Sequence, residues 1–178
     1  MSDKEKMLTK DEFNFMLKKA GLKSNEFCDF LGISYHTYKI SWGKKIFIPK
    51  YAVSYIELYL KIKDYNIFVE KLFNFIDIKN DIFLKKINII NEDMLKRKKG
   101  DFTRKDFLKR IKKLNIQRNE FCKKVDIAYQ TITNWDNLCY VPLWVEAWLD
   151  IYEKAQECEK YKILFKDFLI NNEGLLAL

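Results

Sequence analysis

Apolar residues recur at helical spacing along the chain, and two long runs of them stand out. In the first run the apolar positions lie alternately four and three residues apart, at Tyr51, Tyr55, Leu58, Ile62, Tyr65, Val69, Leu72 and Ile76. The second run keeps this register, with one polar member, at Trp144, Trp148, Ile151, Ala155, Cys158, Lys162, Phe165 and Leu169. This spacing is the heptad seam of a long, coiled-coil-like helix. The sequence therefore predicts two long helices, starting at the only two prolines, Pro49 and Pro142.

A short helix is predicted at the start of each half of the chain. Thr9 and Glu12 have the spacing of a capping box, in which each side chain accepts a hydrogen bond from the backbone of the other residue. Thr103 and Asp106 repeat this device in the second half. Both helices then continue with apolar residues at helical spacing.

Two further short helices follow in each half. The first of these is expected over residues 24–31 and 118–125, and the turn after it falls on Gly32 or on Asp126. Glycine adopts the left-handed backbone of such a turn without steric cost, whereas aspartate does so less readily. The next helix is expected to begin two residues after the turn. Two short helices across such a turn are the helix-turn-helix pattern.

The two halves share a set of motifs in the same order: NEFC, an aliphatic pair, Tyr-x-Thr, a tryptophan and a proline. One stretch reads NEFCDFLGISYHTYKISWGKKIFIP and the other reads NEFCKKVDIAYQTITNWDNLCYVP. Matches that stay collinear over about fifty residues indicate a duplicated module. We therefore predict an all-α fold with two helix-turn-helix modules, at residues 8–76 and 102–171, joined by a connector with a basic hinge at residues 77–101.

The order of these features resembles the lambda-repressor-like, or XRE-type, helix-turn-helix domain. That family has a small residue at the cysteine of NEFC, a glycine at the position of Gly32, and an apolar residue at the positions of Tyr38 and Ile132. The resemblance covers residues 8–62 and 102–155. It implies binding to double-stranded DNA, with the third helix of each module in the major groove.

The sequence departs from the family pattern at two places. Asp126 replaces the turn glycine in the second module. The first module also holds one more residue between Thr37 and Trp42 than the second holds between Thr131 and Trp135. These differences leave open where the first recognition helix ends and whether both modules bind DNA.

Carried over by position, the resemblance implies DNA contacts from the third helices and their surroundings. In the first module the candidates are Tyr35, His36, Thr37, Lys39, Lys44 and Lys45. In the second module they are Arg118, Asn119, Tyr129, Gln130, Thr131, Thr133 and Asn134. Gln and Asn can form paired hydrogen bonds with adenine, Thr can touch the thymine methyl group, and Lys can reach guanine. Arg118 and Asn119, like Ser24 and Asn25 in the first module, begin the second helix, where phosphate is favoured.

Charge is distributed unevenly along the chain. The total is +8, from 33 basic and 25 acidic residues. Nine basic residues and only two acidic ones lie between Arg104 and Lys124, whereas six acids and a single lysine lie between Asp126 and Glu157. A basic balance alone is often only a solvated surface, but a cationic stretch beside an acidic one points towards a phosphate partner.

Several classes of protein are disfavoured by what the sequence lacks. No run of about eighteen apolar residues would span a membrane, and the first residues do not read as a secretory signal. The four cysteines have no metal-ligand spacing. There is no Gly-rich phosphate loop or nucleophile motif. We therefore expect a cytoplasmic, nucleoid-associated protein that is not an enzyme and needs no cofactor.

The sequence leaves two questions open. The long helices could pair with each other inside one chain, or with those of a second chain in a homodimer. Function is predicted as sequence-specific binding of double-stranded DNA by a transcriptional regulator. The alternatives are an adaptor protein that binds other proteins through degenerate helix-turn-helix modules, and an architectural or phage DNA-packaging protein.

Overall fold

A computed structural model describes residues 8–44, 47–76, 86–89, 98, 100–138 and 140–171. Within these ranges the protein is all-helical, without strands, as predicted. Its elements in chain order are α1 (Lys10–Ala20), α2 (Ser24–Leu31), η1 (Thr37–Ser41), α3 (Lys50–Ile76), α4 (Arg104–Lys113), α5 (Arg118–Val125), α6 (Tyr129–Asn134) and α7 (Leu143–Asn171). None of the described helices is both long enough and apolar enough to cross a membrane.

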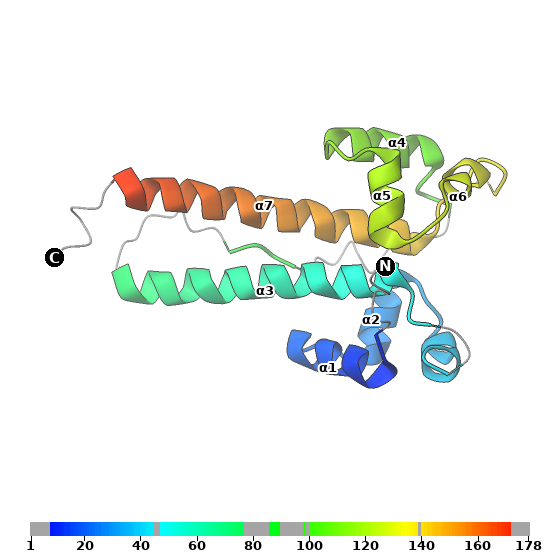
Figure 1. Cartoon of the computed structure of the whole chain (residues 1–178), viewed down its shortest axis with the longest axis horizontal. Helices are drawn as coiled ribbons and strands as arrows, with labels where there is room; N and C mark the ends of the chain where they lie inside the picture. Colours follow the sequence, from blue (N-terminus) through cyan, green and yellow to red (C-terminus); the bar gives the residue numbers. More distant parts are fainter. Residues whose placement is uncertain are drawn as a thin grey trace, which may run out of the picture.

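The long helices α3 and α7 lie side by side and run in the same direction (Figure 1). Helices α1 and α2 lie beside the beginning of α3, and α4, α5 and α6 lie beside the beginning of α7 (Figure 1). The short helices of both halves are therefore gathered at one end of the molecule. Their order along the chain is the same in the two halves, except that η1 takes the place of an α-helix.

The predicted seams join α3 to α7. In α3 the seam positions from Tyr55 to Val69 are buried except for Leu58, which is half-buried. In α7 the positions from Trp148 to Cys158 are buried, and Lys162, the polar member, is half-buried. The heptad prediction is confirmed over these positions; Leu72, Ile76 and Leu169 lie outside the described side chains. Helices α3 and α7 contact each other, so over these positions the long helices pair within one chain.

Local signals in the sequence explain where the short helices start and stop. The capping boxes of Thr9 with Glu12 and of Thr103 with Asp106 are both present. The turn after α2 has Gly32 at φ 62°, and the turn after α5 has Asp126 at φ 55°. Both residues adopt the left-handed conformation that the sequence predicts for them.

Three aromatic rings form the centre of the group of short helices in each half. In the first half, the ring centroids of Phe13 and Trp42 are 5.9 Å apart, and Phe27 packs edge-on against both rings. In the second half, Phe107 lies 5.0 Å from both Phe121 and Trp135. Edge-to-face packing at these distances is favourable. Both tryptophans are fully buried.

The additional residue in the first half is accommodated by a turn of π-helix. The backbone N–H of Trp42 donates to the carbonyl of Thr37, five residues earlier, at 3.3 Å. A π turn inserts one residue into a helix without changing which face its end presents. The third element of the first module therefore differs from the regular helix expected there, but Trp42 still reaches the core as Trp135 does.

The two halves share one continuous hydrophobic core. Packing is crosswise: α2 contacts α7, and α5 contacts α3. At this junction Gly32 lies so close to α7 that a Cβ atom placed on it would be 2.7 Å from the Cβ of Leu143. The buried thiols of Cys28, Cys122 and Cys158 belong to the same core. The halves are therefore not independent of one another in packing.

Candidate nucleic-acid interface

The predicted DNA-contacting residues lie at the end of the molecule where α3 and α7 begin. Most of them are solvent-exposed, including Tyr35 at 48 % and Tyr129 at 42 %. The other exposed members of the set are His36, Lys39, Lys44, Arg118, Asn119, Gln130, Thr133 and Asn134. Thr37 and Thr131 are half-buried. Lys45 lies outside the described residues.

The elements η1 and α6 stand on opposite sides of the helix pair and both project past its end (Figure 1). Each follows its turn at Gly32 or Asp126, so the exposed side chains of both elements point away from the shared core. The structure thus brings the two sets of sequence-predicted residues to one end of the molecule, in two separate groups.

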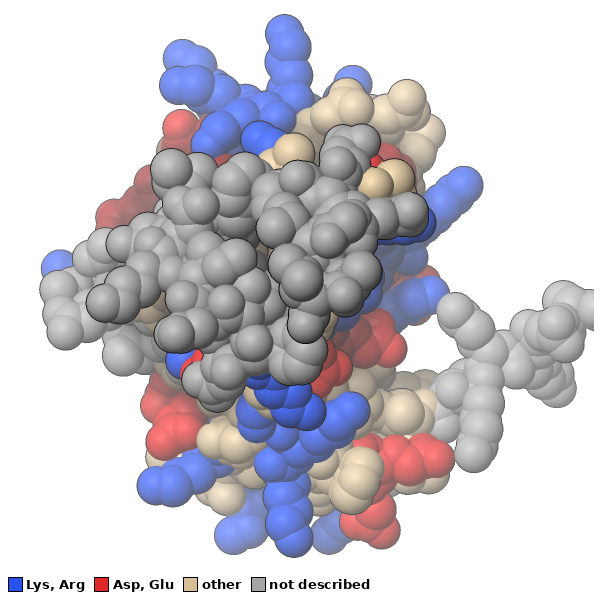
Figure 2. Space-filling model, turned by 90° about the vertical axis from the view of Figure 1, so that its left-hand side faces the viewer, with Lys and Arg blue, Asp and Glu red and all other residues tan. Residues whose placement is uncertain are grey.

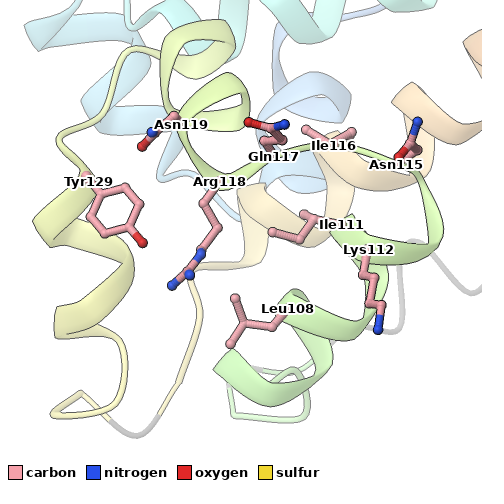
Figure 3. A pocket seen from close by; sticks show the side chains of 9 residues that line it. All are labelled: Leu108, Ile111, Lys112, Asn115, Ile116, Gln117, Arg118, Asn119 and Tyr129. Carbon is pink, nitrogen blue, oxygen red and sulfur yellow. The ribbon is translucent and has the colours of Figure 1, made fainter.

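An open hollow of about 550 Å³ lies in the second module, where α4, the start of α5 and α6 meet. Arg118 extends into it from α5, and its guanidinium carbon is 5.4 Å from the centre of the Tyr129 ring (Figure 3). Lys112 and Asn119 also line the hollow (Figure 3). The start of a helix, an arginine and a lysine around one depression form a site that suits a phosphate group.

A similar hollow of about 520 Å³ lies in the first module. Four lysines line it, at Lys10, Lys18, Lys23 and Lys39. Sequence reasoning selected only Lys39 among these. The signal that could have found Lys18 is the repeat, because Lys18 and Lys112 hold the same position in the two modules and both line their hollows.

The floor of the first hollow is a polar cluster around Tyr38. The Tyr38 hydroxyl donates to the side-chain oxygen of Asn14 and accepts from Ser24 at 3.2 Å. Lys10 donates to the carbonyl of Tyr38 at 2.8 Å and lies over its ring. Burial lowers the pKa of Lys10 to about 8. Ser24, which was expected to meet phosphate, is therefore engaged inside the protein instead.

Gln130 and Asn134 lie on the same exposed strip of α6. The Gln130 side-chain amide donates to the Asn134 side-chain oxygen at 3.3 Å. Residues four apart are neighbours on a helix surface. Gln130 and Asn134, the two residues predicted to contact adenine, are thus joined into one polar edge in the protein alone.

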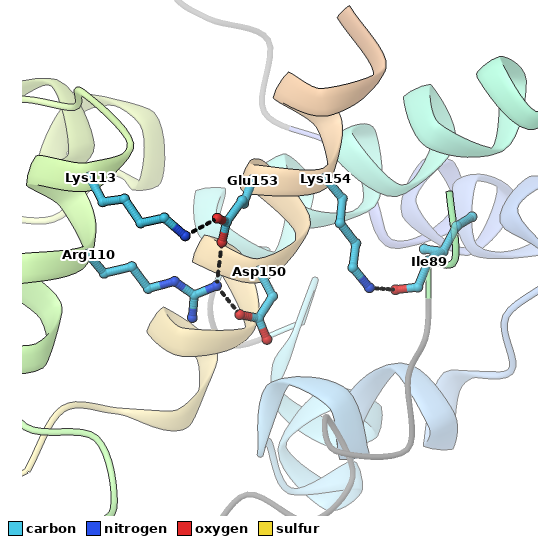
Figure 4. Close-up of polar contacts among 6 residues, drawn as sticks. All are labelled: Ile89, Arg110, Lys113, Asp150, Glu153 and Lys154. Carbon is cyan, nitrogen blue, oxygen red and sulfur yellow. Dashed lines mark hydrogen bonds and ion pairs between the residues drawn. The ribbon is translucent and has the colours of Figure 1, made fainter. Parts of the chain in front are cut away.

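The cationic stretch of residues 104–124 is partly neutralised by its own protein. Arg110 pairs with Asp150 and, at 3.2 Å, with Glu153, and Lys113 pairs with Glu153 at 2.8 Å (Figure 4). These pairs hold α4 against α7, and the lysine and arginine partners lower the pKa of Glu153. Arg104 pairs with Asp136. Acidic residues of the stretch 126–157 thus form ion pairs with basic residues of the stretch 104–124.

Other basic residues of this stretch remain in solvent. Those without an ion pair inside the described structure are Lys105, Lys109, Lys112, Arg118 and Lys123. Seen from the end where α3 and α7 finish, Lys and Arg side chains project from the upper and lower edges of the molecule, with acidic side chains among them (Figure 2). Positive charge is thus carried by both halves of the protein.

No family model, no curated protein and no solved structure matches this chain. Its function must therefore be inferred from the geometry of the two groups of exposed residues and from the helix-turn-helix pattern of the sequence.

Proposed function

We propose that the protein binds double-stranded DNA in a sequence-specific manner and acts as a transcriptional regulator. Each module would place its third element, η1 or α6, in a major groove. A duplex lying across the end of the helix pair would meet both elements. Within one chain the two modules would then act as a covalent pseudo-dimer that reads two unlike half-sites about one helical turn apart.

The observation that carries this proposal is the arrangement of the second module. An exposed Gln130–Asn134 edge on α6 adjoins a hollow lined by Lys112 and Arg118 at the start of α5. The polar edge offers donors and acceptors to bases, and the hollow offers positive charge to the neighbouring phosphate. The first module supports the same interpretation through Lys39 and the lysines around its own hollow.

A protein partner is the second candidate, and two exposed apolar residues favour it. Phe47 is 70 % exposed and Leu138 is 51 % exposed, and each follows the third element of its module. Large apolar side chains at such positions are typical of protein interfaces. An adaptor of this kind would bind through the same end of the molecule but would not depend on Arg118 or Lys112.

The proposal is tested by fluorescence anisotropy with a labelled random-sequence duplex of about 30 base pairs. Lys112→Ala and Arg118→Ala are each expected to weaken binding and to reduce the slope of log K against log salt by about 0.9. Lys166→Ala, an exposed change near the far end of α7, is the matched control and should change neither quantity. Equal effects of all three variants would contradict the assignment of Lys112 and Arg118 to the interface. Absence of binding at low salt would contradict DNA binding and favour the adaptor.

A further inference from the structure

The paired helices α3 and α7 form a groove that is filled by an extended segment of the same chain. Ile87 in this segment is buried, with 4 % of its surface exposed. The side chain of Asn66 on α3 accepts from the backbone N–H of Ile87 at 2.9 Å and donates to its carbonyl at 2.8 Å. Lys154 on α7 donates to the carbonyl of Ile89 at 2.9 Å (Figure 4). Asn66 thus pairs with the segment as a neighbouring strand would.

The helix pair has a second groove, beside α5, that no described segment fills. Its volume is about 610 Å³. Tyr152 lies ten residues after Pro142, as Tyr59 lies ten residues after Pro49. Tyr152 lines the open groove, and Tyr59 lines a hollow of about 420 Å³ beside the bound segment. Lys124 of α5 lies 5.4 Å from the Tyr152 ring at the edge of the open groove.

The polar groups that hold the segment in the first groove have counterparts in the second. Glu159 takes the position of Asn66, and Lys61 takes the position of Lys154. A carboxylate can accept a backbone N–H, and an ammonium group can donate to a carbonyl, so the pair offers both functions to an extended backbone. Lys61 and Glu159 are 3.9 Å apart with half or more of each side chain exposed. An exposed pair of this kind is weak and can open to receive a ligand.

The open groove differs from the filled one in its charge. Lys124 stands where the first half has Phe30, and Lys160 stands where it has Ile67. With Lys61 this gives three lysines that line the groove together with Glu159. Lys124 also pairs with Glu120 at 3.5 Å, and Glu159 also pairs with Lys162 at 3.5 Å, both near the surface, so Lys160 is the groove lysine without an ion pair among the described residues. A ligand that is complementary to the lysines carries acidic side chains. The same ligand would place an aliphatic side chain against Tyr152 and the apolar residues beside it.

We propose that this second groove is a binding site for an extended acidic peptide of a partner protein. The peptide places an aliphatic residue against Tyr152, donates a backbone N–H to Glu159, and directs its carboxylates towards Lys61, Lys124 and Lys160. This site is separate from the proposed DNA interface and does not depend on it.

A synthetic peptide based on the internal segment tests the proposal. The probe is a labelled octapeptide with the sequence of residues 85–92 in which Lys85 and Lys86 are both changed to glutamate. Anisotropy titration of the full chain should give saturable binding with Kd below about 1 mM. Amide resonances of residues 152–164 should shift during the titration, while those of α1 should not. The octapeptide with its natural lysines should bind about tenfold more weakly, because its charge matches that of the groove lysines.

Charge-reversal variants on α7 distinguish binding in this groove from non-specific electrostatic attraction between the acidic peptide and the basic protein. Lys160→Glu should weaken binding of the acidic octapeptide about five- to tenfold, and Lys166→Glu, an equal change of charge on an exposed position outside the groove, should not. Both variants must give the circular dichroism of the unmodified protein. The proposal is overturned by absence of saturable binding, by equal binding of both octapeptides, or by equal losses in the two variants.

Discussion

The rings of Tyr51 and Trp144 stack with their centroids 4.3 Å apart and their planes inclined by 16°. These residues hold the same position at the beginning of α3 and α7, two residues after each proline. Their contact therefore aligns the two long helices at the end that carries the short ones. It places η1 and α6 at the same level on either side of the pair.

Loss of this stack should destabilise the whole molecule. Trp144 is half-buried and also faces Phe121. We expect Trp144→Ala to lower the free energy of unfolding by about 2–4 kcal/mol, measured by urea denaturation. The control is Phe15→Ala, which removes a ring that is 68 % exposed and should cost less than about 0.5 kcal/mol. Similar losses for the two variants would show that the ring contact does not align the helices.

Substitution of the two left-handed turn residues, Gly32 and Asp126, should change the stability of the protein in opposite directions. Gly32→Ala puts a side chain on a left-handed residue and against Leu143, so it should cost about 2–3 kcal/mol. Asp126→Gly removes the conformational strain at φ 55° and should be neutral or stabilising by up to about 1 kcal/mol. Thermal unfolding of both variants measures this. A harmless Gly32→Ala would mean that α7 does not approach the turn as closely as the structure has it.

The features of the fold that depend on residues close together in the sequence could be predicted. The capping boxes, the left-handed turns and the heptad seams all depend on residues a few positions apart, and all were predicted. The closeness of Gly32 to Leu143 was not, because crosswise packing of α2 on α7 depends on contacts about a hundred residues apart. The π turn at η1 was also missed: the extra residue was visible, but its accommodation depends on Trp42 reaching the core.

Lys10 should make stability depend on pH. Its pKa in the folded protein is lowered to about 8 by burial, against its ordinary value of 10.5. Between these values the unfolded chain binds a proton that the folded protein has lost, so the free energy of unfolding should rise with pH across this window. Below pH 8 both states are protonated and this contribution is constant. Burial raises the pKa of the Cys28, Cys122 and Cys158 thiols above their ordinary value of 9.0, so these groups lower the free energy of unfolding as pH rises above 9. The contribution of Lys10 is therefore the difference between the unmodified protein and Lys10→Met, measured by urea denaturation from pH 7 to pH 9. This difference should grow with pH, and parallel curves would contradict the lowered pKa.

Gln130 and Asn134 should determine base preference, not overall affinity. We expect Gln130→Ala and Asn134→Ala each to cost about 1–3 kcal/mol on the preferred site and to relax selection at one position. Binding to unrelated duplexes should stay within about twofold. Equal losses on every sequence would assign both residues to the backbone instead. Both variants must keep the circular dichroism of the unmodified protein, and Lys166→Ala, an exposed change far from α6, is the control.

The site was only partly predictable from sequence. Positions on the third elements could be assigned because the turn fixes which residues follow it. The charged surface could not, since Arg104, Arg110 and Lys113 are held by acids of α7 and of the loop after α6. A count of charges along the sequence assigns these three residues to a cationic face. In the folded protein they form ion pairs with acidic residues that are distant in sequence. The lysines that line the hollows, apart from Lys39, were missed because the residues around each hollow come from separate helices.

A binding selection from random duplex DNA at two salt concentrations tests sequence-specific recognition most directly. The proposed function predicts enrichment of an asymmetric site with two unlike halves. It also predicts that affinity falls steeply as salt rises, because the release of counterions from DNA is then less favourable. Salt-sensitive binding without any enriched sequence would contradict specific recognition and favour an architectural role. Absence of binding at low salt would contradict DNA binding altogether.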